Sequence, residues 1–225
     1  MRGLCWAGMV GFVLTYPCLC RAGATVLTPN LATIKDGKTW RLINAECNTV
    51  IEKGKTVARL KPKGMVPQGS NIGLALVEEL TFGEGTIEVD LKGKGKRETS
   101  FVGVAFSVVD GKSFEAVYFR PFNFMRDDPS FRAHAVQYIA WPQYTWENLR
   151  RAKPGRYESS VHPVPDPSGW FHARIEVTKQ TVRVWVDDGK EPCLVVDRLV
   201  SHSKGKVGLW VDSKDGAFSE LKISN

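Results

Sequence analysis

Apolar and polar residues alternate along several segments of this chain, and this period of two limits its fold more than any other feature. Ile, Val and Leu alternate with Glu and Asp over residues 87–91, and the same pattern recurs over residues 171–177. A turn at 179–180 leads into a third alternating segment, 182–186, which predicts a hairpin. Strands of this kind bury one face and expose the other. We therefore expect antiparallel sheets that cover a shared core.

Further segments of the same kind, and one short helix, complete the predicted all-β fold. Strands are expected at residues 74–80, 101–108, 114–119, 134–140, 207–211 and 218–223. Residues 74–80 and 86–91 are expected to pair as a hairpin across Phe82-Gly83-Glu84-Gly85. Residues 145–152 predict the helix, because Thr145 can cap its first turn. About ten short strands with glycine-rich turns indicate an antiparallel sandwich of two packed sheets.

Residues 1–24 have the pattern of a cleaved signal peptide. A single charge at Arg2 precedes an apolar stretch over 4–14, and the small residues Ala22-Gly23-Ala24 suit a cleavage site. The apolar stretch is too short for a membrane-spanning helix, which needs about 20 residues. We expect residues 25–225 to form a single domain that is secreted or periplasmic and that has no membrane attachment after cleavage.

Two cysteines remain in the mature chain, Cys47 and Cys193. Two cysteines in an oxidising compartment favour one disulfide between them, and we predict that bond. Two separate buried thiols are the alternative, because a sequence gives no distance between the two positions.

The C-terminal half of the chain resembles the concanavalin A-like lectin/glucanase superfamily. The likeness is carried by WFHARIEV at 170–177, VRVWVD at 182–187, GKVGLW at 205–210 and the final strand at 218–223, and it extends over residues 70–225. Within the superfamily the chain is most similar to laminin G-like and 3-keto-disaccharide hydrolase-type domains. The resemblance implies a jelly-roll sandwich whose concave face and rim loops meet carbohydrate.

The segment between residues 118 and 146 is the expected binding site, because aromatic, amide and arginine side chains gather there outside the regular alternation. The predicted polar contacts are Tyr118, Arg120, Asn123, Gln137 and Tyr138, and the predicted stacking platform is Trp141 or Trp146. A sugar ring can stack on an aromatic face while amides and guanidinium groups bond its hydroxyls. The alternative is that both tryptophans plug the end of the sandwich as core residues.

Other motifs predict no catalytic or metal centre. Glu88-Val89-Asp90 is similar to the start of the family 16 glycoside hydrolase signature, but Lys92 stands where a third acid is needed, so we favour a solvated strand face. The histidines are too scattered for a zinc site: His134, His162, His172 and His202. Residues 212–216 are expected to form a turn and not a calcium loop. We expect no metal and no cofactor.

These observations support three functions, in descending order. The first is an exported carbohydrate-active protein that binds a glycan; whether it is also a glycoside hydrolase or lyase is left open. The second is a non-catalytic laminin G-like domain that binds another protein. The third is a polyanion binder, because the net charge is +7 and basic residues cluster at 92–97 and 150–156. We expect no nucleic-acid partner.

Overall fold

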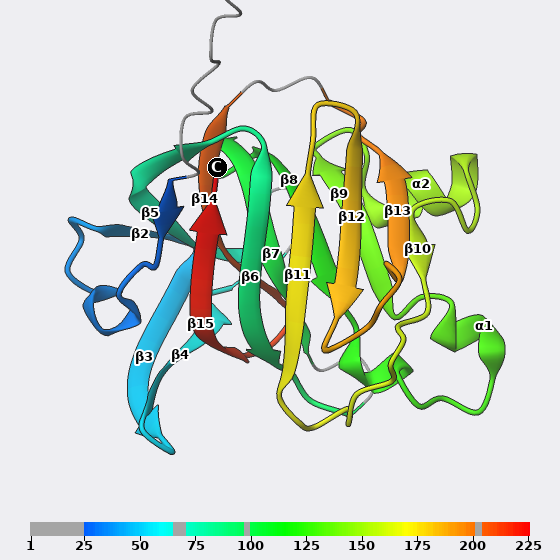
Figure 1. Cartoon of the computed structure of the whole chain (residues 1–225), viewed down its shortest axis with the longest axis horizontal. Helices are drawn as coiled ribbons and strands as arrows, with labels where there is room; N and C mark the ends of the chain where they lie inside the picture. Colours follow the sequence, from blue (N-terminus) through cyan, green and yellow to red (C-terminus); the bar gives the residue numbers. More distant parts are fainter. Residues whose placement is uncertain (1–24, 65–70, 97–99, 201–203) are drawn as a thin grey trace, which may run out of the picture.

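The computed structural model describes residues 25–64, 71–96, 100–200 and 204–225, which form two packed antiparallel sheets (Figure 1). The predicted signal peptide and His202 lie outside these residues. One sheet has eight strands and the other seven. The predicted all-β, two-sheet sandwich is therefore confirmed.

The first sheet has β15 near its centre. In spatial order its strands are β13 (Leu194–Asp197), β12 (Thr181–Val186), β11 (Phe171–Val177), β6 (Gly85–Lys92), β15 (Gly216–Ser224), β4 (Lys55–Pro62) and β3 (Ala45–Glu52), and β1 (Val26–Leu27) pairs with β15. The predicted hairpin of 171–186 is confirmed as β11 and β12, with Ile175 opposite Val184.

The second sheet lies behind the first in Figure 1. In spatial order its strands are β10 (Glu158–Ser159), β9 (Val136–Trp141), β8 (Ser113–Phe119), β7 (Phe101–Asp110), β14 (Gly205–Asp212), β5 (Gly73–Phe82) and β2 (Trp40–Ile43). The order places β14, from the end of the chain, between β7 and β5. Residues from distant parts of the sequence are thereby brought to one surface.

The predicted hairpin between residues 74–80 and 86–91 is wrong. Both strands form, as β5 and β6, but β5 belongs to the second sheet and β6 to the first. The short turn after Phe82 thus carries the chain from one layer to the other. The side chain of Phe82 is fully buried where the chain crosses, so the apolar pattern on either side fits a crossing as well as a pairing.

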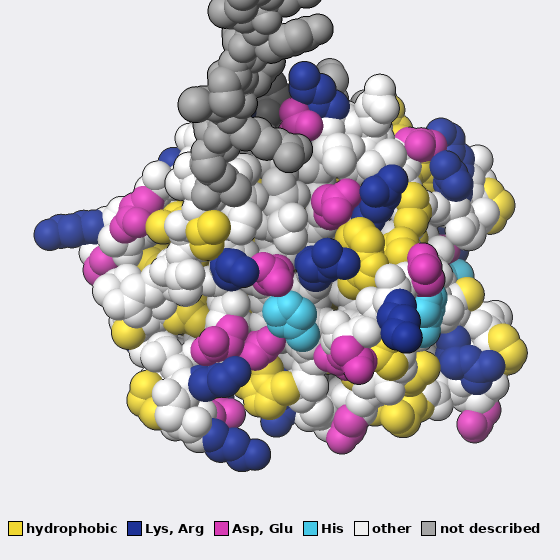
Figure 2. Space-filling model, in the orientation of Figure 1, with side chains coloured by type: hydrophobic (Ala, Val, Ile, Leu, Met, Phe, Trp, Pro, Cys, Tyr) yellow, Lys and Arg dark blue, Asp and Glu magenta, His cyan; other side chains and the backbone are white. Residues whose placement is uncertain are grey.

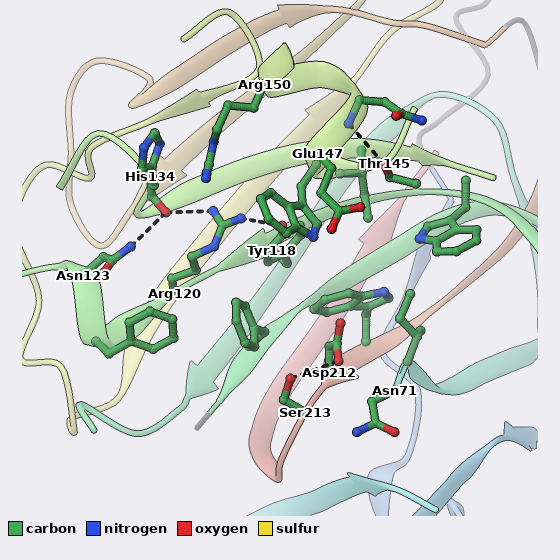
Figure 3. Close-up of a pocket in the computed structure, with 18 of the residues that line it drawn as sticks. Asn71, Tyr118, Arg120, Asn123, His134, Thr145, Glu147, Arg150, Asp212 and Ser213 are labelled. Atoms are coloured by element: carbon green, nitrogen blue, oxygen red, sulfur yellow. Dashed lines mark hydrogen bonds between the residues drawn. The ribbon is translucent and has the colours of Figure 1, made fainter. Parts of the chain in front are cut away.

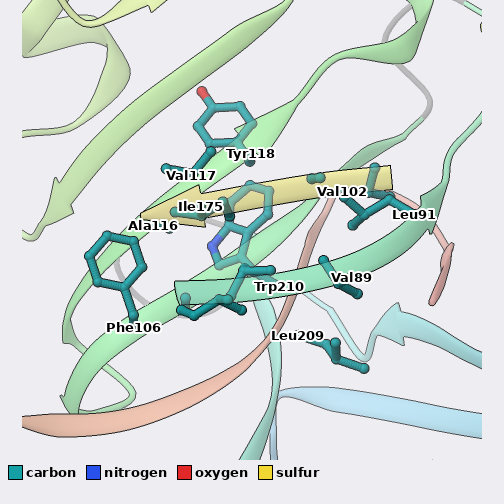
Figure 4. Packing of buried hydrophobic residues seen from close by; sticks show 14 of the residues in the cluster. Val89, Leu91, Val102, Phe106, Ala116, Val117, Tyr118, Ile175, Leu209 and Trp210 are labelled. Atoms are coloured by element: carbon teal, nitrogen blue, oxygen red, sulfur yellow. The ribbon is translucent and has the colours of Figure 1, made fainter. Parts of the chain in front are cut away.

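The core lies between the sheets (Figure 4). Val89, Leu91 and Ile175 project into it from the first sheet, and Val102 and Leu209 from the second, and all are fully buried. These are the apolar members of the alternating pattern. Burial of each such side chain stabilises the fold by about 1.5–3 kcal/mol relative to exposure.

In the part of the chain that the structure describes, four short helical segments accompany the sheets: η1 (Leu31–Thr33), η2 (Pro121–Asn123), α1 (Pro129–Arg132) and α2 (Trp146–Ala152). The predicted helix and its cap are confirmed in α2, where Thr145 accepts a hydrogen bond of 3.3 Å from the backbone N–H of Asn148. No helix in the described ranges is long and apolar enough to cross a membrane.

The predicted disulfide between Cys47 and Cys193 is wrong, because both are buried free thiols. Cys47 lies on β3 and Cys193 immediately precedes β13, so they stand at opposite edges of the first sheet. Neighbouring strands are about 4.8 Å apart, so positions at opposite edges of this sheet are separated by several such spacings. The Cα atoms of a disulfide must lie within about 7 Å of each other, and these two cysteines therefore cannot be bridged. Burial raises the pKa of the Cys47 thiol to about 11 and that of Cys193 to about 12, which keeps both protonated at neutral pH.

Candidate functional site

The outer face of the second sheet can be identified from the side chains that point away from it. Phe119 packs edge-on against Phe171 of the first sheet, with ring centroids 5.1 Å apart, so Phe119 faces inward. Its neighbour Tyr118 must face outward. The register places Tyr118 opposite Gln137 on β9 and opposite Gly103 on β7, and Gly103 opposite Trp210 on β14.

Tyr118 and Trp210 form a stacked aromatic pair on this outer face, with ring centroids 4.7 Å apart and planes inclined by 26°. They meet across Gly103, which lies between them on β7. A Cβ at position 103 would fall 2.2 Å from the carbonyl oxygen of Val117 and 2.6 Å from the Cα of Tyr118. Glycine is therefore required there by the close approach of the neighbouring strand.

A pocket of about 730 Å³ lies over this pair. Its wall is rich in aromatic rings and holds both signs of charge. The aromatic lining residues are Phe101, Tyr118, Phe122, Phe131, Trp141, Trp146 and Trp210. The polar ones are Asn71, Arg120, Asn123, His134, Thr145, Glu147, Asn148, Arg150, Asp212 and Ser213. In Figure 3, Arg120, Asn123 and His134 stand at one end, and Asp212, Ser213 and Asn71 at the other.

Arg120 forms the cationic end of the pocket. It follows β8, and its side chain is held by three neutral oxygens: Nη1 donates to the His134 carbonyl at 2.8 Å, and Nη2 donates to the Tyr118 hydroxyl and to Gln137 Oε1, both at 2.7 Å. Its guanidinium carbon lies 4.9 Å from the centre of the Tyr118 ring. Arg120 is 6% exposed. Burial raises the pKa of Tyr118 to about 12, so this hydroxyl stays neutral beside it.

A second group of charges fixes helix α2 above the sheet. Arg150 donates from Nε and Nη2 to the two carboxylate oxygens of Glu158 on β10, at 3.0 and 2.6 Å. His134 Nδ1 lies 2.9 Å from the same carboxylate. Burial lowers the pKa of His134, and this effect outweighs the negative charge of Glu158, which raises it. These contacts hold α2 at the pocket through its last turn, with Arg150 5.0 Å from the centre of the Trp146 ring.

Two carboxylates approach the pocket from different elements. Asp212 ends β14, and burial raises its pKa. Ser213 Oγ donates to its Oδ1 at 3.2 Å. Glu147 lies exposed in the first turn of α2 and points into the pocket from the opposite side (Figure 3).

The two predicted stacking tryptophans have different surroundings. Trp141 is partly buried and stacks on Phe114, with centroids 6.4 Å apart. Trp146 is 41% exposed and lines the pocket from α2. Trp141 therefore packs against the sheet and also lines the pocket, whereas Trp146 presents more of its side chain to solvent.

The structure brings five of the predicted site residues to the pocket: Tyr118, Arg120, Asn123, Trp141 and Trp146. Gln137 faces the same side but is fully buried beneath it, where it supports Arg120. Tyr138 is not brought there. It faces inward, and its hydroxyl donates to Glu115 Oε2 at 2.6 Å and accepts from the Leu199 N–H at 3.1 Å. Glu115 therefore lies on the opposite face from Tyr118.

The prediction missed several lining residues, above all Trp210 and Asp212. One signal was present in the sequence: on β14 the inward positions are Val207, Leu209 and Val211, so Trp210 occupies a position that the alternation assigns to solvent. A large aromatic residue there indicates an outer face that is itself covered or used for binding.

Glu88 and Asp90 lie on the outer face of the first sheet, on the other side of the sandwich from the pocket. Asp90 Oδ1 is 2.8 Å from His172 Nδ1, and Lys222 pairs with Glu88 at 3.0 Å. The hydrogen bond to Asp90 raises the pKa of His172. Figure 2 shows this face as a mixture of acidic, basic and histidine side chains. The expected solvated strand face is thus what the structure contains.

Comparisons with known proteins match the fold. No family model and no curated protein matches the sequence. Among solved structures, the carbohydrate-binding module CBM66 from Bacillus subtilis matches with a TM-score of 0.57 and 14% identity over 82% of this chain and 95% of that one. The β-glucanase of Bacillus licheniformis matches with a TM-score of 0.54 and 12% identity over 91% and 99%.

A third match is the κ-carrageenase of Pseudoalteromonas carrageenovora, solved with an oligotetrasaccharide of κ-carrageenan, with a TM-score of 0.52 and 13% identity over 94% and 98%. The chain therefore shares the two-sheet jelly-roll fold of these structures, and the predicted fold is confirmed. The narrower likeness to laminin G-like and 3-keto-disaccharide hydrolase-type domains stays a prediction.

Proposed function

We propose that this protein is exported and binds a glycan in the pocket on the outer face of the second sheet. The observation that supports this most is the combination of an exposed Trp146 with convergent polar groups around one cavity. A sugar presents apolar C–H faces and a rim of hydroxyls, so it needs both an aromatic surface and hydrogen-bonding groups. Trp146 supplies the first, and Asn123, Glu147 and Asp212 supply the second.

The fold comparisons point the same way. The matched structures include a protein named as a carbohydrate-binding module and two glycan-degrading enzymes. A laminin G-like protein-binding role would instead favour an exposed apolar patch without converging polar side chains. The pocket has charged and amide groups at both ends, which favours a glycan over a protein surface.

A glycan array probed with residues 25–225 tests the proposal, followed by calorimetric titration of the best ligand. We expect Trp146→Ala to lose binding while its melting curve stays cooperative. Trp170→Ala is the matched control, since Trp170 is similarly exposed and does not line the pocket. The proposal is wrong if no glycan binds, or if Trp146→Ala binds as tightly as the parent protein.

Glycoside hydrolysis is a second candidate, favoured by the two carboxylates at the pocket. A hydrolase of this kind uses one protonated acid and one ionised carboxylate. Burial raises the pKa of Asp212, which suits a proton donor, and Glu147 brings a second carboxylate to the pocket from α2. Release of reducing ends from the array ligand, and its loss in Asp212→Asn, would support this activity. Binding without any product would leave a non-catalytic module.

Export can be tested separately. Expression of residues 1–225 in a bacterial host should give a mature protein that begins at or near residue 25. N-terminal sequencing of the periplasmic and medium fractions gives the cleavage site. An uncleaved chain confined to the cytoplasm would contradict the proposed export.

A further inference from the structure

Arg120 is a buried cation at the pocket that has no carboxylate of the described residues within ion-pair distance. Asp212, at the other end of the pocket, feels its charge without contacting it. Within the described ranges its hydrogen-bond partners are a carbonyl, a hydroxyl and an amide oxygen, and no ion pair within 4.0 Å involves it. An arginine cannot lose its proton to escape this situation. A buried charge without a counter-ion is costly to a fold.

Two other arginines near this sheet are paired with carboxylates. Arg198, in the interior, has its guanidinium 2.8 Å from the carboxylate of Glu115, and both side chains are almost completely buried. Arg150, at the pocket wall, has two charge-assisted bonds to Glu158. The chain thus supplies a carboxylate to each of these cations but not to Arg120.

The surroundings of Arg120 hold its guanidinium in place and leave donors available. Its three side-chain hydrogen bonds use three of the five N–H groups of a guanidinium. Gln137 and Tyr118 fix its plane from beneath, and Asn123 approaches the same His134 carbonyl at 3.5 Å. A pre-positioned cation on the wall of a pocket is a site for an anion.

We propose that the pocket selects a sugar that bears a carboxylate, a uronic acid, with its carboxylate beside Arg120 and its ring against Trp146. This inference rests on the proposed glycan-binding function and specifies its substrate class. Asn123 is placed to donate to the carboxylate or to an adjacent hydroxyl. Asp212 and Glu147, toward the far end, are placed to accept hydrogen bonds from hydroxyls of the next ring.

The test compares ligands that differ in the carboxylate alone. Oligogalacturonate, oligoglucuronate, oligomannuronate and oligoguluronate are each titrated calorimetrically against their carboxyl-reduced forms, with the unaltered protein. Hydrogen bonds to charged groups contribute about 1.5–3 kcal/mol, so at least one uronate should bind about tenfold or more tightly than its reduced partner. Sulfated galactan oligosaccharides form a further arm.

Two variants locate the effect. Arg120→Gln should remove the preference for the uronate, and Arg183→Gln, on the first sheet and paired with Glu176, should keep it. Equal affinity for every uronate and its reduced form overturns the inference but leaves glycan binding intact. Preferred binding of a sulfated oligosaccharide also overturns it. Failure of every glycan to bind overturns both proposals. The ligand comparison decides the matter even if Arg120→Gln does not fold.

Discussion

The interior ion pair between Glu115 and Arg198 gives the sharpest prediction about what holds the second sheet to its neighbour. Glu115 accepts from Arg198 Nε at 3.0 and 3.1 Å, from Arg198 Nη2 at 2.8 Å and from the Tyr138 hydroxyl at 2.6 Å. Its side chain is fully buried and that of Arg198 is 4% exposed. Glu115→Gln keeps the shape but leaves the Arg198 charge uncompensated. Removing one partner of such a pair costs about 3–5 kcal/mol.

Urea denaturation at neutral pH measures this cost as a change in the free energy of unfolding. The matched control is Glu176→Gln, which removes a surface partner of Arg183 and should cost no more than about 1 kcal/mol. A Glu115→Leu/Arg198→Met double variant should be less destabilised than the sum of its single variants. If Glu115→Gln costs no more than Glu176→Gln, the account of a buried, energetically coupled pair is refuted.

Three further outcomes are expected. Trp210→Ala should lower the free energy of unfolding by about 3–5 kcal/mol because Trp210 is fully buried, whereas Trp146→Ala should lower it by about 1 kcal/mol. Thermal melts of the two variants measure the difference, and equal losses of stability would contradict their different burial. Gly103→Ala should lower the free energy of unfolding by about 1–3 kcal/mol, because the added methyl group would meet backbone atoms of the neighbouring strand. A near-UV circular dichroism spectrum identical to that of the parent protein would show undisturbed aromatic packing and count against this. The pKa of His172 should exceed 6.5 and should fall in Asp90→Asn. The interaction of His172 with Asp90 therefore stabilises the fold fully below pH 6.5, and this stabilisation is lost as pH rises through the raised pKa. NMR titration of the imidazole ring measures the pKa, and a value unaltered by Asp90→Asn would contradict the prediction.

The fold was largely predictable because its main signal is local. A period of two in the apolar residues follows from each strand having one buried face, and β6, β11 and β12 each display it. The failures were relations between segments. A tight turn after Phe82 can join two strands of one sheet or cross between two sheets, and the flanking residues are apolar in either case. The separation of Cys47 from Cys193 is likewise absent from the sequence.

The site was predictable only in part, for the same reason. Tyr118, Arg120 and Asn123 are close in sequence and reach the pocket together. Gln137 and Tyr138 are consecutive on one strand, so they must face opposite ways, and their joint assignment to one surface could not hold. Trp210 and Asp212 come from a strand far along the chain that enters the sheet beside β7, a pairing that no local pattern predicts.

The central claim is that a glycan binds on the outer face of the second sheet, and chemical-shift mapping tests it most directly. Isotopically labelled protein is titrated with the tightest ligand from the array while backbone and indole N–H signals are followed. We predict the largest changes at the Trp146 indole, Arg120, Asn123 and Asp212, with His172 unaffected. Changes centred on His172 and the outer face of the first sheet, with the pocket signals unmoved, would contradict the account.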